Sequence, residues 1–330
     1  MSALRSWVKD TRPVRVALFL TQNALVTARS IVRPWRRPAD EQTGPTYELA
    51  AMIRVKDEGR FLPEWIAHHL NVGVRHVFVY DNNSTDGIED VIAPFVDTGE
   101  VTYVQWRPIP ASPSCEYDFL RRFGRRCRWV AFFDADEFLV EERPGALGAV
   151  LEEHHDRPAV AVCWRYHGSS SHEVIPVGLV TERFFRADAV LNRHVKVIAR
   201  PSEIVRHRNS HSFFYRRGRL AVTPEGTRVF GSFIEPPTST RLELRHYVYR
   251  SREDYDSKTR RGYVDALGAR DQWRNVAVPD TEFSKHNEAE MPVDPEVLRA
   301  TATRLRELGY PEHLWSATAS TPSPRRSVAR

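Results

Sequence analysis

Hydrophobic residues follow two alternating periods along the first half of the chain. Short runs rich in β-branched and aromatic residues have the composition of buried strands, and segments with apolar residues at every third or fourth position predict amphipathic helices. Strands are predicted at 49–55, 76–80, 101–106 and 129–133, and helices that begin near Leu62, at Ile88 and at Glu116. This alternation predicts a mostly parallel sheet that is covered by helices on both faces.

The second half of the chain has a more mixed pattern. It predicts a short helix around 147–153, strands at 159–164, 195–199, 212–216 and 242–249, and a polar loop at 167–172. Ser251 to Asp254 match a capping box, which predicts a helix that runs from there towards Leu267.

The two ends of the chain depart from both patterns. The stretch from Val14 to Ala28 is mostly apolar but is interrupted by charged and amide residues, so it is too short and too polar to span a membrane. We expect it to form a helix that docks on the domain; because basic residues flank it, the alternative is a helix on an anionic membrane surface. The chain then divides into a basic N-terminal segment and linker at 1–45, a domain at 46–270, and a C-terminal helical extension with a disordered tail at 271–330.

Composition is that of an ordinary globular protein. The chain has 330 residues, a net charge of +5 and a pI near 9.2, and only five of its 48 basic residues are lysines. The arginines are spread along the chain rather than gathered in one stripe, so they favour anionic ligands without implying a nucleic acid partner. The three cysteines lack the spacing of a metal site and indicate a reducing compartment.

Acidic residues gather where the fourth predicted strand ends. Trp129 to Phe133 run directly into Asp134, Asp136 and Glu137. Ligands of an open α/β sheet bind beyond the carboxyl ends of its strands, and Asp-x-Asp on an extended backbone sends two carboxylates the same way. Such a pair suits a divalent cation that shares its remaining ligands with phosphate and water.

A second acidic turn, Asp81 to Gly87, ends the predicted strand at 76–80 and precedes a helix. Two such turns predict a nucleotide-diphosphate site in which one carboxylate receives the base or ribose and the other pair holds a metal on the diphosphate. The chain has neither a GxGxxG fingerprint nor a Walker loop, which counts against a dinucleotide enzyme and a P-loop NTPase. The alternative is that 81–86 is only an Asx turn that caps a helix.

The order of these motifs resembles the GT-A glycosyltransferases, and within them the family 2-like and family 92 (DUF23-type) group. The resemblance covers roughly Leu49 to Gly262 and rests on Lys56-Asp57-Glu58, Glu64-Trp65, His68-His69, Gly73-Val74, Tyr80 to Gly87, Phe132 to Leu139, Trp164 with Gly168-Ser169-Ser170, Gly178 to Phe184, Val195 to Ile198, His211-Ser212-Phe213, and His246-Tyr247 with Arg250-Ser251. It implies a GT-A (Rossmann-like) three-layer α/β/α fold with a mostly parallel central sheet. The nucleotide-sugar half would then be 46–140 and the acceptor half 141–270.

The resemblance also implies an activity: a metal-dependent, inverting transfer of sugar from a nucleotide sugar to a glycan or lipid-linked saccharide in cell-surface polysaccharide biosynthesis. The implied donor is a UDP-sugar and the implied metal is Mn²⁺ or Mg²⁺. Donor contacts are implied at Val55, Lys56, Glu58, Asp81, Asn83, Asp134 and Lys196. By the resemblance, Asp136 would be the leading metal ligand and Asp134 would be shared between ribose and metal. A late histidine would complete the metal shell, His211 in preference to His246; the alternative for either is a core or turn histidine.

An inverting transfer needs a general base for the acceptor hydroxyl. Glu182 best matches the downstream acid of the family, with Glu137, Glu173 and Asp188 as competitors; an ordinary ion pair between Glu182 and an arginine is the non-catalytic alternative. Trp164, Tyr166 and His167 are candidates for a sugar-stacking platform. His68 and His69, beside Trp65 on a predicted helix, are expected to be structural.

Two other classes of protein fit part of the pattern. A phosphohydrolase with an aspartate nucleophile also has Asp-x-Asp after an apolar strand, but it requires a Ser or Thr soon afterwards, where this chain has Glu137-Phe138-Leu139. The arginine content fits a non-catalytic carbohydrate-binding or polyanion-binding protein. For the transferase we expect a cytoplasmic location, peripheral at the inner face of the plasma membrane, with a nucleotide sugar and a saccharide acceptor as partners.

Overall fold

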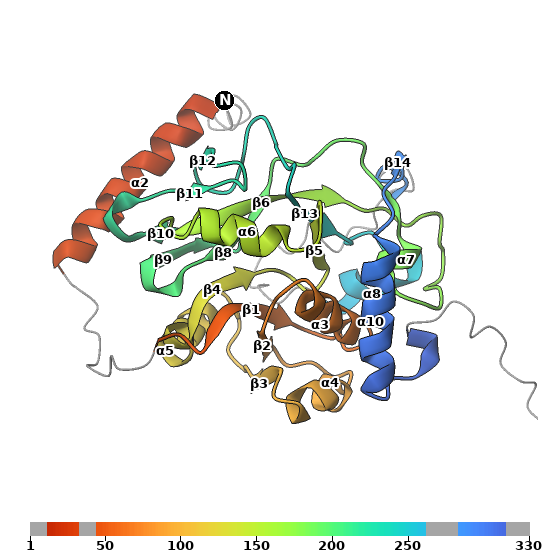
Figure 1. Cartoon of the computed structure of the whole chain (residues 1–330). Coiled ribbons are helices and arrows are strands. Elements are labelled where there is room, and N and C mark those ends of the chain that lie inside the picture. Colours follow the sequence, from red (N-terminus) through yellow and green to blue (C-terminus); the bar gives the residue numbers. More distant parts are fainter. Residues whose placement is uncertain (1–11, 33–43, 262–282, 315–330) are drawn as a thin grey trace, which may run out of the picture.

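The computed structural model of the protein describes residues 12–32, 44–261 and 283–314. Its centre is a ten-stranded sheet in which eight strands follow the order β12-β11-β6-β8-β4-β1-β2-β3 (Figure 1). The first half of the sheet is parallel: β1 (Tyr47–Val55) pairs with β2 (His76–Asp81) and β4 (Cys127–Phe132), and β2 pairs with β3 (Val101–Gln105).

The sheet continues past β4 through an antiparallel strand, β8 (Val195–Ala199), which pairs with β4 on one side and β6 (Ala159–Tyr166) on the other. β6 also pairs in parallel with β11 (Ala221–Val222) and β13 (Leu242–His246). β13 lies antiparallel to β5 (Glu137–Glu141), and β12 (Arg228–Val229) ends the sheet. The carboxyl ends of β4, β6 and β13 thereby come together.

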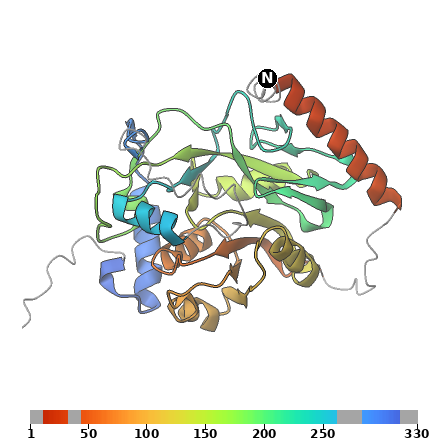
Figure 2. The same ribbon diagram turned by 180° about the vertical axis from the view of Figure 1, so that it is seen from behind.

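Two cores cover the two faces of the sheet because side chains alternate along each strand. Ala51 and Ile53 of β1 face the core that contains α3 (Leu62–Asn71), α4 (Ile88–Asp97) and α6 (Ala146–Glu153). Ala50 and Met52 face the core that contains α5 (Ser114–Arg122) and the hairpin of β9 (Ile204–Asn209) and β10 (Ser212–Tyr215). Figures 1 and 2 show the sheet between these layers.

The remaining elements lie at the edges. α10 (Pro295–Glu307) packs on α3, where the Thr301 hydroxyl oxygen accepts a hydrogen bond from the Asn71 side-chain amide. β7 (Arg186–Ala187) pairs with β14 (Ala289–Glu290), and the short helix α7 (Val180–Arg183) and α8 (Arg252–Arg261) lie near them. Ser251 caps α8 by accepting a hydrogen bond from the Asp254 amide, as the capping box predicts.

The predicted α/β class with a mostly parallel central sheet is confirmed. Each strand and helix predicted before position 133 is present with ends shifted by a few residues. The strand β5 was not predicted: Glu137 is its first residue rather than part of a turn. The predicted linker at 33–45 and the tail fall almost wholly outside the described residues, and the domain boundaries stay a prediction.

The predicted helix near the N-terminus is α2 (Arg12–Val32), and it docks on the β9–β10 hairpin. Phe19 is buried and stacks on Phe214 with ring centroids 5.7 Å apart, and Asn23 donates a hydrogen bond to the Gly218 carbonyl. The docking prediction is confirmed. Among the described helices, none is both long enough and apolar enough to cross a bilayer.

His68 and His69 have the expected structural role. Both are buried on α3, and they bind the backbone of Leu139 in β5, one ring at its carbonyl and the other at its amide. Burial lowers the pKa of His68 to about 4, so this ring is neutral at physiological pH. The pair attaches α3 to the strand that follows the acidic turn.

Candidate active site

The turn between β4 and β5 fixes the three predicted acids. The Glu137 amide donates to the Asp134 carbonyl, and the Glu137 carboxylate accepts from the Asp134 amide at 2.8 Å. The Trp65 indole of α3 donates to the carbonyls of both residues. Asp136 and Glu137 are buried, whereas the Asp134 side chain keeps 40% of its exposure. Asp134 is therefore the acid that an approaching ligand meets first.

Asp134 is paired with two cations. The Lys196 ammonium lies 2.6 Å from one carboxylate oxygen, and the Arg54 guanidinium lies 3.8 Å from the other. Burial acts to raise the pKa of Asp134, but the charges of Lys196 and Arg54 outweigh it and lower that pKa. These groups line a hollow of about 260 Å³ together with Glu116 and Asn209.

Asp136 has a separate set of partners. The Lys258 ammonium of α8 hydrogen-bonds one carboxylate oxygen, and His246 Nε2 at the end of β13 lies 3.4 Å from the other. Burial opposes ionisation here too, yet Lys258 and His246 hold the pKa of Asp136 well below its usual range. The two aspartates therefore have different partners, since Asp134 binds the buried Lys196 and Asp136 binds the buried Lys258.

Glu137 lies behind both aspartates and is fully buried. Burial raises its pKa to about 7, although the Lys196 ammonium, 3.6 Å away, acts in the opposite direction. Its second oxygen has no hydrogen-bond partner among the described residues. An enclosed carboxyl of this kind holds the turn and adjusts the local charge; it is not placed to receive a proton from an acceptor in solution.

The predicted metal set is only partly assembled. Asp136 and His246 bring one oxygen and one nitrogen to 3.4 Å from each other, a donor pair that suits Mn²⁺ or Mg²⁺ when phosphate and water complete the shell. His246 Nδ1 is buried and has no hydrogen-bond partner in the part of the chain that the structure describes. Asp134 is turned towards Lys196, and within the described residues no group of three His, Cys, Asp or Glu side chains has a metal-binding arrangement. The residues fit a cation held by two protein ligands rather than three.

His211 is not the histidine that the structure brings to Asp136. Its Nδ1 bonds the Val195 carbonyl at 3.1 Å, and burial, followed by the charge of Lys196, lowers its pKa to about 3. The preference for His211 over His246 is therefore reversed by the geometry: His246 is the histidine with an aspartate contact.

The Asp81 side chain closes the second acidic turn, and this turn is also tied to the turn that follows β1. Both oxygens of Asp81 are occupied, one by the Ser84 amide and the other by the Tyr103 hydroxyl at 2.7 Å. Asp57 accepts from the Thr85 amide, so the turn after β1 is held against the turn after β2. Asp81 is buried, and its predicted nucleoside contact stays a prediction.

The other predicted donor residues border these loops. The Val55 carbonyl accepts from the Asn82 amide, and the Asn83 amide side chain donates to the Arg107 carbonyl. Lys56 is half-buried in the same turn. Glu58 is buried against Arg250, whose guanidinium also binds Asp254 and lies over the Phe61 ring. Glu58 is thus a link between the β1 turn and α8.

Two of the predicted bases, Glu182 and Glu173, lie apart from the aspartates. Glu182 is on α7, 3.9 Å from Arg183, and makes no contact with Asp134 or Asp136 among the described residues. Its one ion pair is the non-catalytic alternative considered above. The Glu173 side chain is exposed, and its backbone carbonyl accepts from the Glu253 amide. The fold therefore does not bring Glu182 or Glu173 close to the two aspartates.

The predicted sugar platform is mostly interior. Trp164 is 4% exposed and His167 is fully buried, so neither ring is open to a sugar. Trp164 instead packs against His246 and stacks on His194. Tyr166 alone keeps a partly exposed ring, because it lies at the end of β6. The platform interpretation is wrong for Trp164 and His167.

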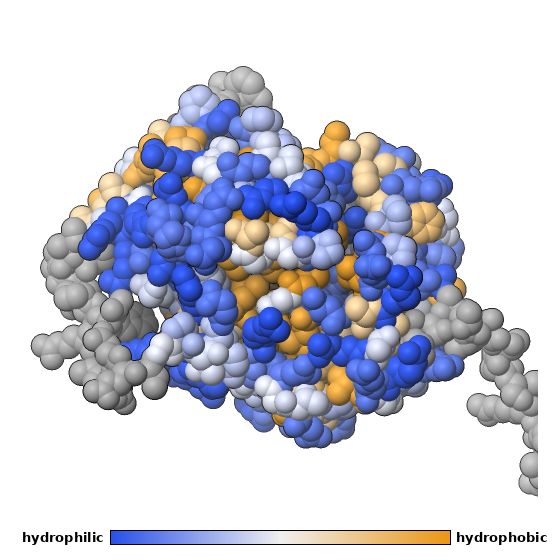
Figure 3. All heavy atoms as spheres, viewed as in Figure 1, coloured by the Kyte–Doolittle hydropathy of each residue, from blue (hydrophilic) through white to orange (hydrophobic). Residues whose placement is uncertain are grey.

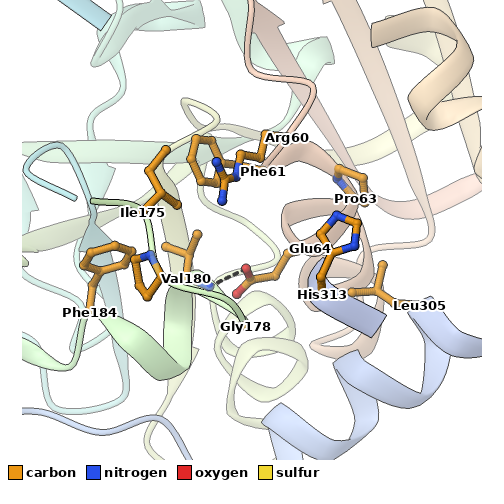
Figure 4. A pocket seen from close by; sticks show the side chains of 11 residues that line it. Arg60, Phe61, Pro63, Glu64, Ile175, Gly178, Val180, Phe184, Leu305 and His313 are labelled. Carbon is orange, nitrogen blue, oxygen red and sulfur yellow. Dashed lines mark hydrogen bonds between the residues drawn. The ribbon is translucent and has the colours of Figure 1, made fainter. Parts of the chain in front are cut away.

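A second hollow lies beside α7 (Figure 4). Glu64 of α3 points into it and caps α7, accepting from the Val180 and Thr181 amides and the Thr181 hydroxyl. Burial nevertheless raises the pKa of Glu64 to about 7. This carboxylate attaches α7 to the main domain.

We expect Glu64→Gln to remove part of the pH dependence of stability. A carboxyl whose pKa is about 7 folded and 4.5 unfolded binds more protons in the native state, so its contribution is present below pH 4.5 and lost as pH rises through 7. The loss is on the order of 2 to 3 kcal/mol across this window. Urea unfolding at pH 5 and pH 7 measures it.

The matched control is Glu182→Gln, which lies on α7 next to Thr181 and is more than a third exposed. It should leave the pH dependence of the free energy of unfolding as it is in the wild type. Equal pH slopes for Glu64→Gln and the wild type would show that the buried carboxyl stays ionised in the folded chain.

Two residues of the site were not predicted, Arg54 and Lys258. One signal for Lys258 was available in the sequence. In a chain with so few lysines, Lys196 and Lys258 are both buried, and each binds one aspartate of the Asp-Ala-Asp motif. A compact ammonium fits a site that a planar guanidinium does not, so rare buried lysines are informative in an arginine-rich chain.

Comparison with known proteins gives one family. The model of glycosyltransferase family 92 matches residues 57–307. The family 92 protein Os08g0121900 of Oryza sativa subsp. japonica is 31% identical over 212 residues, which are 59% of this chain and 34% of the rice protein. The family 92 protein At1g27200 of Arabidopsis thaliana is 34% identical over 100 residues, 30% of this chain and 17% of the other. The chain thus spans about a third or less of the length of these relatives.

Solved structures are more distant. S. aureus TarS in complex with UDP is 14% identical with a TM-score of 0.33, and the match covers 80% of this chain and 67% of that one. Glucosyl-3-phosphoglycerate synthase from Mycobacterium tuberculosis in complex with phosphoglyceric acid is 19% identical with a TM-score of 0.26, covering 43% of this chain and 53% of that one. Because both TM-scores are low, we assign the fold from the strand order of this chain alone. Because the family match includes both acidic turns, β8 and α8, the chain belongs to glycosyltransferase family 92.

Proposed function

We propose that the protein transfers a sugar from a nucleotide sugar, a UDP-sugar in the first place, to a saccharide acceptor with inversion at the anomeric carbon. The observation that carries the proposal is the β4–β5 turn of a family 92 chain, where two aspartates meet two buried lysines at the carboxyl end of the sheet. We further propose that the acceptor is a glycan or lipid-linked saccharide.

The cations of the site suit the leaving group. Arg54 and Lys196 line the hollow beside Asp134, and a nucleoside diphosphate that departs as an anion gains from fixed positive charge in a partly dehydrated site. Asp136 and His246 would hold Mn²⁺ or Mg²⁺, which supplies further positive charge to the diphosphate when bound. Asp134, the more exposed acid, would receive a ribose hydroxyl, and its exposure supports this role.

A thermal-shift panel tests the proposal. UDP-, GDP-, CMP- and dTDP-sugars are compared with and without Mn²⁺, because a ligand of the native state stabilises it by about 2.7 kcal/mol at a hundred times its Kd. We expect the largest shift with a UDP-sugar and Mn²⁺ together. The anomeric configuration of the product, measured by NMR, tests inversion. The absence of a shift with every nucleotide sugar would contradict the proposal.

We also propose that α2 rests on an anionic lipid surface at the cytoplasmic face of the plasma membrane. Leu18, Leu20 and Leu25 of α2 are each about half exposed, and Leu18 and Leu25 lie on the same face of the helix. Hydrophobic residues are visible along α2 in Figure 3. The sequence from Ala17 to Ala28 has no charge, and arginines precede and follow it. This pattern suits a helix that lies in the lipid interface.

Vesicle sedimentation checks this placement. We expect the wild type to sediment with phosphatidylglycerol vesicles. The double variant Leu18→Gln/Leu25→Gln should bind the vesicles at least about tenfold more weakly, because each substitution removes apolar surface that would be buried in lipid. Ile109→Gln, an exposed hydrophobic residue elsewhere, is the control. Equal binding of all three proteins, or no binding of the wild type, would contradict the proposal.

A further inference from the structure

We propose that His286, oriented by Asp188, is the general base that takes the proton of the acceptor hydroxyl. This inference rests on the transferase function proposed above and replaces Glu182 in that role. His286 lies in the segment before β14, and its Nδ1 is 2.7 Å from the Asp188 carboxylate. The sequence pattern did not predict that His286 and Asp188 lie together, although Asp188 was one of the candidate bases.

The pairing decides which ring nitrogen is available. An ionised carboxylate only accepts hydrogen bonds, so Nδ1 of His286 carries the donated hydrogen and Nε2 of the neutral ring keeps its lone pair. Nε2 makes no hydrogen bond within the described residues, and the side chain is 13% exposed. A histidine whose one nitrogen is held by a carboxylate and whose other is open has the arrangement of a general base.

The pair lies beside the aspartate site. The ring of Tyr166, at the end of β6, stacks on His246 at 5.3 Å on one side and contacts His286 at 4.9 Å on another. His246 is the side chain that reaches Asp136. The Tyr166 ring therefore contacts both the His286 imidazole and the histidine that reaches Asp136. Tyr166 is also the one member of the predicted sugar platform that is not buried.

The position of His286 is fixed by its surroundings. A Cβ at Gly168 would overlap the His286 carbonyl oxygen, so only glycine lets these two backbones approach so closely. Next to it, Asn287 accepts from the Ser170 amide at 2.8 Å. Tyr249 stacks on the imidazole with centroids 4.7 Å apart. A base held from this many directions keeps its geometry when the acceptor arrives.

The step balances without an additional reactant. The O–H bond of the acceptor breaks and its proton moves to Nε2 of His286, while the acceptor oxygen forms the new bond to the anomeric carbon. The bond from that carbon to the diphosphate oxygen breaks, and its electron pair leaves with the nucleoside diphosphate. The Asp188 carboxylate stabilises the imidazolium, which then returns the proton to solvent.

The test compares His286→Ala and Asp188→Asn with the wild type. The reaction is UDP release from UDP-glucose or UDP-galactose, with the methyl glycosides of glucose and galactose as acceptors. Both variants should bind the donor as the wild type does in the thermal-shift assay, while kcat falls about a hundredfold or more. Added imidazole should restore part of the kcat of His286→Ala, which it would not do for a residue with a structural role.

His155→Gln, an exposed histidine at the end of α6, is the matched control and should keep the wild-type kcat. Donor binding by the wild type tests only the proposed transferase function. A failure of that function can therefore be distinguished from a failure of the base role proposed for His286. If both variants bind the donor normally and keep more than half of the wild-type kcat, the base assignment is wrong and the transferase function stands. Loss of donor binding in His286→Ala, or loss of kcat without rescue by imidazole, would also overturn it.

Discussion

Asp136→Asn should lower kcat for sugar transfer about a thousandfold. Asp136 is the acid that meets both His246 and Lys258, so its charge sets the electrostatics at the proposed diphosphate position. A cation and its ligand contribute several kcal/mol to the stabilisation of developing negative charge, and each 1.4 kcal/mol is tenfold in rate. UDP release from the donor that gives the largest thermal shift measures the effect.

The same substitution also affects stability, because it leaves the buried Lys258 ammonium without a counter-ion. Removal of one partner from a buried pair costs about 3 to 5 kcal/mol. The double variant Asp136→Asn/Lys258→Met removes both charges and should regain most of this stability without regaining activity. The two variants therefore separate a folding defect from a catalytic defect.

Asp97→Asn, on the exposed end of α4, is the matched control and should change neither quantity. The assignment of Asp136 would be contradicted if Asp136→Asn kept more than a tenth of the wild-type kcat. It would also be contradicted if the double variant recovered activity along with stability, since the loss would then be a consequence of unfolding.

The parts of the fold that the sequence predicts are those set by local composition. The strand at 49–55 is an apolar run interrupted only by Arg54, and the helix from Leu62 has apolar residues at every fourth position. β5 was missed because its five residues begin and end with glutamate and take their identity from pairing with β13, more than a hundred positions later. Strand pairing at that range has no local signature.

In the site, too, the local features were predicted from the sequence and the long-range contacts were not. The two acidic turns follow from the sequence because each directly ends a strand. The partners of those acids do not: Lys258 is 122 positions from Asp136, and His286 is 98 positions from Asp188. Glu182 was favoured by motif order alone, and motif order carries no information on distance. The lysine count is the exception, since a rare residue type indicates a steric requirement wherever it occurs.

Lys196 is the second residue whose loss should have a large effect. Its ammonium is 1% exposed and is shared between Asp134 at 2.6 Å and Glu137 at 3.6 Å. Lys196→Met keeps the length of the side chain and removes the charge. Asp134 is exposed enough to be hydrated, whereas Glu137 is enclosed. The cost of the substitution therefore falls mainly on Glu137.

This gives the stability effect a definite dependence on pH. Burial already raises the pKa of Glu137 to about 7, and removal of Lys196, which lowers it, should raise that pKa further. A carboxyl with a raised folded pKa contributes stability that is complete below its unfolded pKa of about 4.5 and is lost as pH rises through the folded value. Lys196→Met should thus lose more stability than the wild type between pH 5 and pH 8.

We expect Lys196→Met to be close to the wild type at pH 5 and less stable by about 1 to 1.5 kcal/mol at pH 8, because pH 8 lies only about one unit above the pKa of about 7 that Glu137 already has in the wild type. Urea unfolding at the two pH values measures the difference. Lys196→Met/Glu137→Gln should abolish the pH dependence of the loss. Lys196→Arg keeps the charge but adds volume beside Val162 of β6, so its cost of about 1 to 3 kcal/mol should be similar at both pH values. An equal loss for Lys196→Met at pH 5 and pH 8 would show that Glu137 does not depend on this lysine.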